Sequence, residues 1–308
     1  MSGLKTKEKK TLKWLWITLI TIVILVAASG IYLFTVYGSV KSTVNKDTHE
    51  PVKAIDTEVT KEKVAKRDSL NVLLMGVDER AGDKGRSDTM IVMTLDADNS
   101  RAQMVSIPRD TLTEIVGIGV KDKINHAYAF GGSEMSVETV EKFLDIDLDY
   151  YVRVNMEGLE DLVDAVDGIT INNNFEFTEG GRTFKKGEIT LNGKEALSYV
   201  RMRKNDPKGD VGRNERQRQV IQAVLDKGSN ITSITKINKL IGILGKNIVT
   251  NLEFDEIQML YKNYKDVRSN VSSYQMTGEN KVIDGIWYLL VPDEEKAKTT
   301  EMIREYGG

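Results

Sequence analysis

The sequence contains no cysteine and only two histidines among its 308 residues. The absence of cysteine excludes a disulfide framework and thiol chemistry. The motif Gly-x-Ser-x-Gly is also absent, which argues against a serine hydrolase triad. The formal net charge is −3, so the chain lacks the basic excess that nucleic-acid-binding proteins usually carry. What remains is an ordinary globular composition, with 40% apolar and 29% charged residues.

One long uncharged segment runs from Trp14 to Tyr37. Its length of about 24 mostly apolar residues is enough to cross a bilayer as a helix. Five lysines precede it within residues 1–13, so the positive-inside rule predicts a cytoplasmic N-terminus and an extracytoplasmic C-terminal domain. The alternative is a signal peptide cleaved near Ala27–Ser29, but the apolar run continues to Val36 and exceeds a usual signal-peptide core. We therefore predict an uncleaved transmembrane signal-anchor at residues 14–37 of a single-pass cell-membrane protein.

The chain after this segment changes character twice. Residues 38–68 are polar and charged, with little periodicity, and predict a spacer that is partly helical at most. Residues 69–308 alternate short apolar runs with amphipathic stretches, and we predict that they form one catalytic domain.

The predicted strands are Leu70–Met75, Met90–Leu95, Gln103–Ile107, Tyr150–Val154, Ile169–Ile171, Val271–Met276 and Ile286–Val291. The predicted helices are Ser136–Leu144, Met156–Val166, Asn192–Met202, Asn214–Leu225, Ile231–Ile248, Asp255–Tyr264 and Glu294–Tyr306. Interleaved strands and helices favour the α/β class, as an α/β/α sandwich around a mixed central sheet.

Several polar clusters directly follow predicted strands, where ligands bind in open α/β sheets. Asp78 follows the first strand, and Asp88 precedes the second. Two carboxylates with open water positions are how Mg²⁺ is usually held against a substrate phosphate. A solvated turn with incidental acids is the simpler explanation of this cluster taken alone.

Two further clusters carry cations that could face a phosphate. Pro108 ends the third strand before Arg109 and Asp110, and Lys123 opens a Lys-Ile-Asn-His segment. An arginine offers a planar fork matched to phosphate oxygens. The simpler alternative is a surface Arg–Asp pair, and the lone His126 of this segment is more often structural than catalytic.

The densest cluster contains five arginines between residues 201 and 218. Arg213 and Gln217 are four apart and share one face if a helix begins here. A helix N-terminus attracts anions, and arginines placed there favour a pyrophosphate site. A solvated basic face remains an even alternative from the pattern alone.

The clusters, taken in order, resemble the LytR–CpsA–Psr family. The resemblance rests on Leu73–Asp78 with Arg80, Arg86–Thr89, Ser106–Thr111, Lys123–Asn125 with Ala127 and Tyr128, Tyr199–Arg201 with Arg203, and Gly212, Arg213, Arg216 and Gln217. It spans about 150 residues of the outer domain, and the ordered set is far more specific than any single motif. Within the family the chain looks most similar to the LytR-type teichoic acid transferases of Gram-positive bacteria.

The resemblance implies an α/β/α fold with a long apolar pocket for a polyprenyl chain. It also implies a transferase that moves a phosphorylated glycopolymer, such as wall teichoic acid, from a polyprenyl pyrophosphate carrier to the muramic acid 6-hydroxyl of peptidoglycan. By position, Asp78 and Asp88 would coordinate Mg²⁺. The pyrophosphate would be held by Arg86, Arg109, Lys123, Arg201, Arg203, Arg213 and Gln217.

Phosphoryl transfer relies mainly on positioning and charge neutralisation, which these residue types supply. Arg109, Asp110, Asp78 and Asp88 are the candidate catalytic residues. The acceptor hydroxyl also needs a proton acceptor, for which Asp110 or a carboxylate beside Mg²⁺ is available. The alternatives are an extracytoplasmic lipid pyrophosphatase that uses water as acceptor and a non-enzymatic regulator of the cell envelope.

Overall fold

The structure, a computed structural model, describes residues 35, 37–79, 84–203, 206–228 and 247–306. The described residues from Thr43 onward form one compact unit, which is separate from Met1–Ser42. The predicted transmembrane segment falls almost entirely on residues 1–34 and 36, outside the described residues. Among the residues that are described, no helix combines the length and apolar character needed to cross a membrane.

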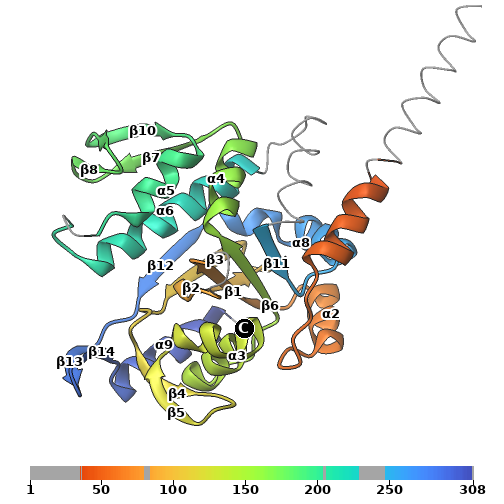
Figure 1. The fold of residues 1–308 in the computed structure, drawn as a ribbon. Coiled ribbons are helices and arrows are strands. Elements are labelled where there is room, and N and C mark those ends of the chain that lie inside the picture. The colour runs from red at the N-terminus through yellow and green to blue at the C-terminus, as the bar shows by residue number, and fades with distance from the viewer. Residues whose placement is uncertain (1–34, 36, 80–83, 204–205, 229–246, 307–308) are drawn as a thin grey trace, which may run out of the picture. The chain divides into compact units, whose positions relative to one another are not determined.

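A six-stranded mixed sheet runs through the centre of the compact unit (Figure 1). Its strand order is β11-β6-β1-β2-β3-β12. The strands are β1 (Leu70–Val77), β2 (Ser87–Asp96), β3 (Arg101–Ser106), β6 (Tyr150–Asn155), β11 (Ile248–Thr250) and β12 (Val271–Gln275). Parallel pairs join β1 to β6 and β3 to β12, and β2 runs antiparallel to both of its neighbours. The mixed central sheet confirms the predicted α/β class.

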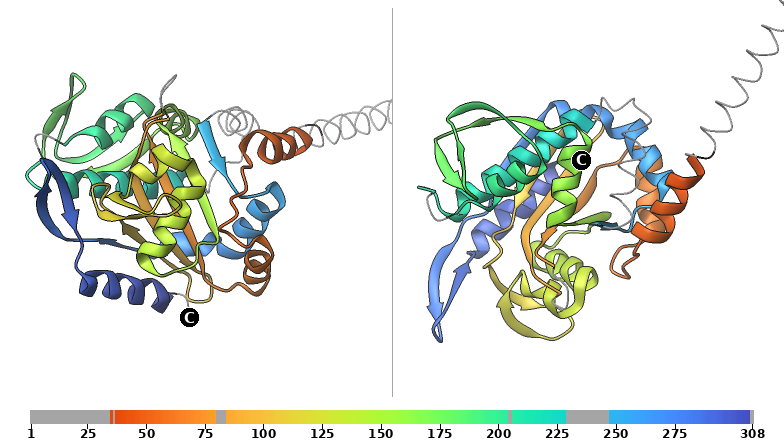
Figure 2. Two further views of the ribbon diagram at one scale, coloured as in Figure 1. Left: turned by 60° about the horizontal axis from the view of Figure 1, so that its bottom comes forward. Right: turned by 45° about the horizontal axis from the view of Figure 1, so that its top comes forward.

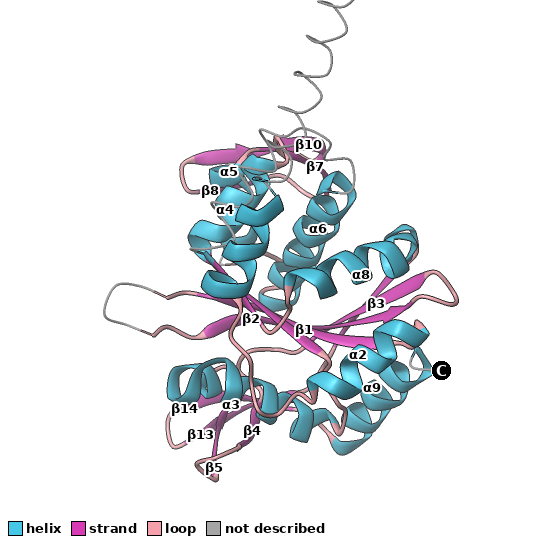
Figure 3. Ribbon diagram, turned by 90° about the vertical axis from the view of Figure 1, so that its right-hand side faces the viewer, coloured by secondary structure: helices cyan, strands magenta, loops and turns pink. Residues whose placement is uncertain are grey.

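Side chains alternate across this sheet and bury apolar groups on both faces, as period-two strands require. Leu73 and Met75 of β1 face one core with helices α3 (His126–Leu144) and α9 (Asp293–Tyr306). Val72 and Leu74 face the opposite core, which includes side chains of α2 (Thr57–Lys66), α6 (Asp210–Gly228) and α8 (Phe254–Tyr264). Figure 3 shows the sheet between these helices.

A further layer extends the unit at the end of the sheet where β1 and β6 finish. It contains α4 (Met156–Ala165), α5 (Gly193–Arg201) and the short strands β7 (Ile169–Asn173), β8 (Phe177–Glu179), β9 (Arg182–Phe184) and β10 (Gly187–Leu191). Phe177, Phe184 and Tyr199 pack together at its centre. An Asn192–Glu195 capping box begins α5, so the local sequence sets where this helix starts.

Two hairpins project near each other from the other flank of the unit (Figure 2). One joins β4 (Leu112–Ile115) to β5 (Val120–Lys123), and the other joins β13 (Glu279–Ile283) to β14 (Ile286–Leu290). A parallel bridge between Thr111 and Leu289 links the two hairpins. The sequence predicted only the last of these four strands, because the other three are short and contain no continuous apolar run.

The segment before β1 belongs to the compact unit. Val52, Ile55 and Val64 are buried in the two cores, and a short π-helical turn (Val44–Thr48) precedes them. The unit therefore begins at Thr43, whereas the sequence placed a spacer over residues 38–68 and the start of the domain at residue 69. Only a few apolar residues anchor this segment, too few to produce a periodic signal.

Most predicted helices correspond to observed ones, with two differences. Helix α3 begins at His126, ten residues before the predicted start, because Gly131 and Gly132 form a non-helical kink that conceals the continuity. The predicted helix at Ile231–Ile248 lies mostly outside the described residues, and Ile248 itself begins β11. A short 3-10 helix (Lys265–Ser269) follows α8.

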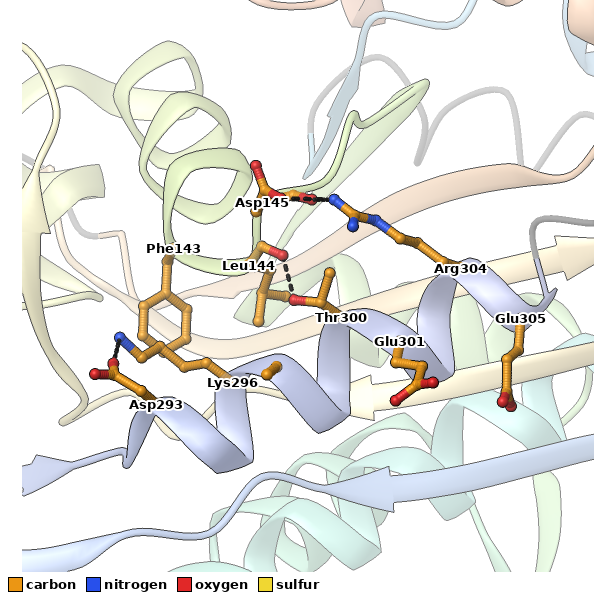
Figure 4. Close-up of a pocket in the computed structure, with 10 residues that line it drawn as sticks. Phe143, Leu144, Asp145, Asp293, Lys296, Thr300, Glu301, Arg304 and Glu305 are labelled. Carbon is orange, nitrogen blue, oxygen red and sulfur yellow. Dashed lines mark hydrogen bonds and ion pairs between the residues drawn. The ribbon is translucent and has the colours of Figure 1, made fainter.

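A groove of about 720 Å³ lies between the end of α3 and helix α9 (Figure 4). Four of its charged side chains form two ion pairs: Arg304 contacts Asp145 at 2.6 Å, and Lys296 contacts Asp293 at 2.5 Å. The groove is lined by none of the residues predicted for the active site, and both of its cationic side chains, Lys296 and Arg304, already pair with aspartates. It is therefore a weaker candidate for substrate binding than the sheet edge described below.

The carboxyl group of Glu141, on α3, gives a prediction for stability against pH. Burial, together with the nearby Asp147 and Glu138, raises its pKa to about 7, although the Leu148 N–H that it accepts at 2.9 Å opposes the shift. The folded state therefore holds a proton that the unfolded state loses near the ordinary value of 4.5. The free energy of unfolding should fall as pH rises between these two values.

The variant Glu141→Gln keeps the hydrogen-bond acceptor and removes the titration. We expect urea unfolding at about pH 5 and about pH 7.5 to show a smaller loss of stability in the variant than in the parent. Equal losses in the two proteins would contradict the assignment.

Candidate active site

The predicted site residues come from strands that end at one edge of the central sheet. Strands β1, β3 and β12 finish there, and the antiparallel β2 begins there. Asp78 directly follows β1, Asp88 is the second residue of β2, and Arg109 lies shortly after β3. The sheet topology thus brings together positions that are up to 31 residues apart in the sequence.

A β-bulge displaces Asp88 from the regular ladder. Gly76 pairs with Thr89 and Val77 pairs with Ser87, so Asp88 is the extra residue with no partner opposite it. Bulges turn side chains out of the regular alternation and occur often beside active sites. The Asp88 carboxylate accepts a hydrogen bond from Arg109, with 2.8 Å between Oδ1 and Nη1.

Arg109 connects this bulge to a second carboxylate. Its Nε lies 3.6 Å from Oδ2 of Asp110, too long for a hydrogen bond but within ion-pair distance. Asp110 in turn accepts a 2.7 Å hydrogen bond from Nζ of Lys123, at the end of β5. Four predicted residues, Asp88, Arg109, Asp110 and Lys123, therefore form one continuous charged network.

The start of α6 supplies a second group of charges. Asp210 is its first residue and lies 3.0 Å from Nη2 of Arg213 and 3.7 Å from Nε of Arg203. Arg213 is 7% exposed, so its guanidinium is largely removed from water. The sequence did not assign a role to Asp210, although its carboxylate forms ion pairs with both Arg203 and Arg213.

Both groups open on one cavity of about 1070 Å³. The predicted residues Arg109, Asp110, Arg201, Arg203 and Arg213 line it. Asp88 and Lys123 reach this lining through their bonds to Arg109 and Asp110. The cavity wall thus concentrates four guanidinium groups in a space large enough for a substrate headgroup.

The electrostatics of the half-buried Arg109 and the buried Arg213 differ. Burial lowers the pKa of Arg213, Asp210 partly restores it, and Arg109 lowers it further. Burial also lowers the pKa of Arg109, but Asp88, Asp110 and Asp210 outweigh burial and raise it. Both side chains remain charged, so the site holds cations that repel each other across a partly dry space.

Each of these arginines also has a buried Nε–H without a hydrogen-bond acceptor among the described residues. Buried donors are normally paired, so two unpaired donors at one cavity call for an explanation. A phosphate or pyrophosphate group would accept from such donors and relieve the repulsion between the two cations. The arrangement is that of an anion site.

Three predicted residues, Asp78, Arg86 and Gln217, do not line this cavity, although each is close to lining residues in the sequence or in the sheet. Asp78 is half-buried, and its N–H donates to the carbonyl of Arg86, whose side chain is exposed. Gln217 lies one helical turn after Arg213 on α6 and is half-buried. Their roles in metal or pyrophosphate binding stay predictions.

The described residues contain no group of three or more histidine, aspartate or glutamate side chains able to hold a metal ion. Asp78 and Asp88 are two carboxylates beside one pair of strand ends. One or two protein carboxylates, completed by substrate phosphates and water, are a usual coordination set for Mg²⁺. The predicted pair is thus compatible with a magnesium ion that arrives with a phosphorylated substrate.

Three residues of the arginine-rich cluster hold α6 against the sheet and against the end of α5, a structural role that the sequence did not assign to them. Arg218 donates to Oγ of Ser106 at 2.5 Å, and Asn214 donates to Oε1 of Gln275 at 3.0 Å, which ties α6 to the ends of β3 and β12. Arg216 is 4% exposed and donates to the carbonyls of Tyr199 and Met202. Two of the five arginines in this cluster, Arg216 and Arg218, therefore have structural contacts, which the spacing in the sequence does not reveal.

Gly212, within α6, shows how tightly this region is packed. Alanine in place of glycine within a helix normally stabilises by about 1 kcal/mol. Here the added Cβ would lie 2.0 Å from Oδ2 of Asp206, a carboxylate held by Arg216 at 2.5 Å. We expect Gly212→Ala to destabilise the protein by about 1–3 kcal/mol instead, because the clash cannot relax freely. Urea unfolding measures this change, and a variant at least as stable as the parent would contradict the prediction.

The sequence profile of the LytR_cpsA_psr family matches residues 31–305. The chain belongs to the LytR–CpsA–Psr family. Its relatives in this family include the polyisoprenyl-teichoic acid–peptidoglycan teichoic acid transferase TagU of Bacillus cereus. That protein is 48% identical over 301 residues, which cover 97% of this chain and 98% of the relative.

Solved structures of LytR–CpsA–Psr relatives agree with this assignment. The crystal structure of Bacillus subtilis TagU is similar with a TM-score of 0.66 and 46% identity, covering 78% of this chain and 97% of that one. A structure of TagT bound to LIIa-WTA is similar with a TM-score of 0.71 and 31% identity, covering 84% of this chain and all of that one. The similarity therefore extends over nearly the whole of each relative.

Proposed function

We propose that this LytR–CpsA–Psr protein is a transferase that moves teichoic acid from a polyprenyl pyrophosphate carrier to peptidoglycan. The observation that carries the proposal is the cavity in which Arg109 and Arg213 present unpaired donors beside an Asp88–Arg109 pair. The relatives named as teichoic acid transferases match this chain along almost its full length. The pyrophosphate of a lipid-linked glycopolymer is negatively charged and would pair with the arginines that line this cavity.

In the proposed reaction, a peptidoglycan hydroxyl oxygen attacks the phosphorus that carries the polymer. The bond from this phosphorus to the bridging oxygen breaks, and polyprenyl phosphate leaves. Arg109, Arg203 and Arg213 hold the phosphate oxygens and offset the charge of the leaving group. The acceptor proton passes to a carboxylate, for which Asp110 and Asp88 are the candidates. The chain is on this account a phosphotransferase.

Asp78 and Asp88 are the residues that would hold Mg²⁺. When bound, the ion would neutralise phosphate charge and fix the substrate oxygens. One oxygen of Asp88 already accepts from Arg109, so the ion and the arginine would share this carboxylate. We further propose that residues 14–37 anchor the chain, which would place the cavity outside the membrane near its lipid-linked donor.

The test uses the purified full chain in detergent with a lipid-linked teichoic acid donor. With Mg²⁺ and peptidoglycan oligosaccharide present, we expect a glycan–phosphate–polymer product by mass spectrometry, and we expect EDTA to abolish it. Release of polyprenyl phosphate at the same rate without the oligosaccharide would identify a pyrophosphatase. Neither product under any condition would favour a regulator without catalytic activity.

A further inference from the structure

The β13–β14 hairpin contributes Asn280, Trp287 and Leu289 to the lining of the cavity that also holds the arginines. Asp284 and Gly285, with φ of 50° and 78°, make the tight turn that joins the two strands. Two consecutive positive φ values match the turn type whose twist suits a two-residue hairpin. The turn therefore fixes how the two strands pair, and with it the positions of the hairpin side chains.

Cross-strand register selects which side chains of the hairpin face the cavity. Asn280 pairs with Leu289, and Val282 pairs with Trp287, so these four lie on one face. Asn280, Trp287 and Leu289 all line the cavity. Tyr288 belongs to the opposite face, where it is 8% exposed and bonds Asp122.

Trp287 is 40% exposed, and Val282 beside it is 63% exposed. A large aromatic ring at a cavity mouth is a frequent mark of a binding surface. The ring also lies close to the charged network, since its centroid is 6.0 Å from Nζ of Lys123. Lys123 bonds Asp110, so the aromatic face lies directly beside the predicted catalytic residues.

The chemistry of this part of the lining matches a carbohydrate better than a lipid. Sugars present apolar C–H faces to aromatic rings and hydroxyl groups to amides, and Asn280 and Thr277 line the cavity near Trp287. The hairpin also exposes Lys281 and Asp284, whose charges oppose insertion into hydrocarbon. The arginines of the cavity suit the phosphorylated donor. The uncharged side chains of the hairpin would then bind the acceptor, which carries no pyrophosphate.

We propose that the face formed by Asn280, Trp287 and Leu289 is the subsite for the acceptor glycan, with Trp287 stacked on one of its sugar rings. This inference rests on the proposed transferase function. It assigns two parts of the cavity lining to two substrates, the donor pyrophosphate to the arginines and the peptidoglycan glycan to the hairpin. The attacking hydroxyl would then approach between Lys123 and Arg109.

A binding experiment tests the subsite without requiring catalysis. The chain has three tryptophans, Trp14, Trp16 and Trp287, so replacing the first two by phenylalanine leaves one fluorescent reporter. Titration of this full chain in detergent with a tetrasaccharide prepared from peptidoglycan should change the Trp287 emission and saturate. No change in emission, with no binding by calorimetry, would overturn the proposal.

Matched variants separate stacking from general effects on the hairpin. By calorimetry, we expect Trp287→Ala to weaken tetrasaccharide binding about tenfold and Trp287→Phe to retain most of it. Ile286→Ala removes an exposed side chain from the opposite face of the same strand and should leave the affinity unchanged. Unchanged affinity in Trp287→Ala, or equal losses in Trp287→Ala and Ile286→Ala, would contradict the subsite.

Transfer kinetics distinguish failure of this inference from failure of the proposed function. Trp287→Ala should raise the KM for the acceptor about tenfold and leave the KM for the lipid-linked donor unchanged. If Trp287→Ala raised only the KM for the donor, Trp287 would belong to the donor site, and the inference would be overturned. Tetrasaccharide binding through Trp287 without any transfer would instead refute the transferase function and leave the glycan site in place.

Discussion

Replacing Arg109 by alanine is expected to lower the rate of teichoic acid transfer by about 10²–10³-fold, the usual effect of removing one preorganised donor from a phosphoryl-type transition state. Arg109 bonds Asp88 at 2.8 Å, lines the cavity and carries a buried Nε–H without a described acceptor. Its loss removes the donor and frees Asp88 from its ion pair. The measurement is kcat/KM for the donor in the purified full chain.

Two further variants show whether the effect depends on the guanidinium fork. Arg109→Lys keeps the charge but cannot make two parallel hydrogen bonds, so we expect it to recover only a small part of the activity. Arg304→Ala removes an exposed arginine paired with Asp145 in the separate groove and should leave transfer unchanged. Full activity in Arg109→Ala would refute the proposed role of the cavity.

Replacing Arg216 by alanine should produce the largest loss of stability, about 3–5 kcal/mol, because it leaves a buried carboxylate without its cation. The Arg216 side chain is 5% exposed and lies 2.5 Å from Asp206, whose side chain is 1% exposed. It also donates to the carbonyls of Tyr199 and Met202 at the end of α5. Arg201 and Arg203 flank Met202, so their placement depends on the same guanidinium.

Urea unfolding measures the Arg216→Ala effect, with Arg304→Ala as a surface comparison expected to change stability by less than about 1 kcal/mol. Arg216 does not line the cavity itself, so the free energy of unfolding, and not the KM, is the measure of its role. A stability loss below about 1 kcal/mol would contradict the assignment of Arg216 to the structural part of the motif.

The edge of the sheet that carries the site could be predicted from the sequence, because apolar strands ending in polar residues mark it. Asp78 directly follows Leu70–Val77, Arg109 lies shortly after Arg101–Ser106, and both strands were recognisable. The order of the motifs also identified the family, which the match over residues 31–305 confirms. These features are local in sequence and need no knowledge of tertiary contacts.

The features that the sequence could not predict depend on register and on distant contacts. The bulge at Asp88 is a property of how two strands pair, and the Asp210–Arg203 ion pair is a property of how α5 and α6 approach. The same limit applies to Trp287, which was part of a predicted strand. Its exposure follows only from the position of the hairpin beside the cavity.

The most direct test is a crystal structure of the outer domain with a short-chain polyprenyl pyrophosphate and Mg²⁺. We predict that both phosphates lie in the cavity, with oxygens at about 2.7–2.9 Å from the guanidinium groups of Arg109 and Arg213, the usual length of such bonds. Mg²⁺ is expected beside Asp88. A pyrophosphate bound elsewhere, with these two arginines free of it, would contradict the account.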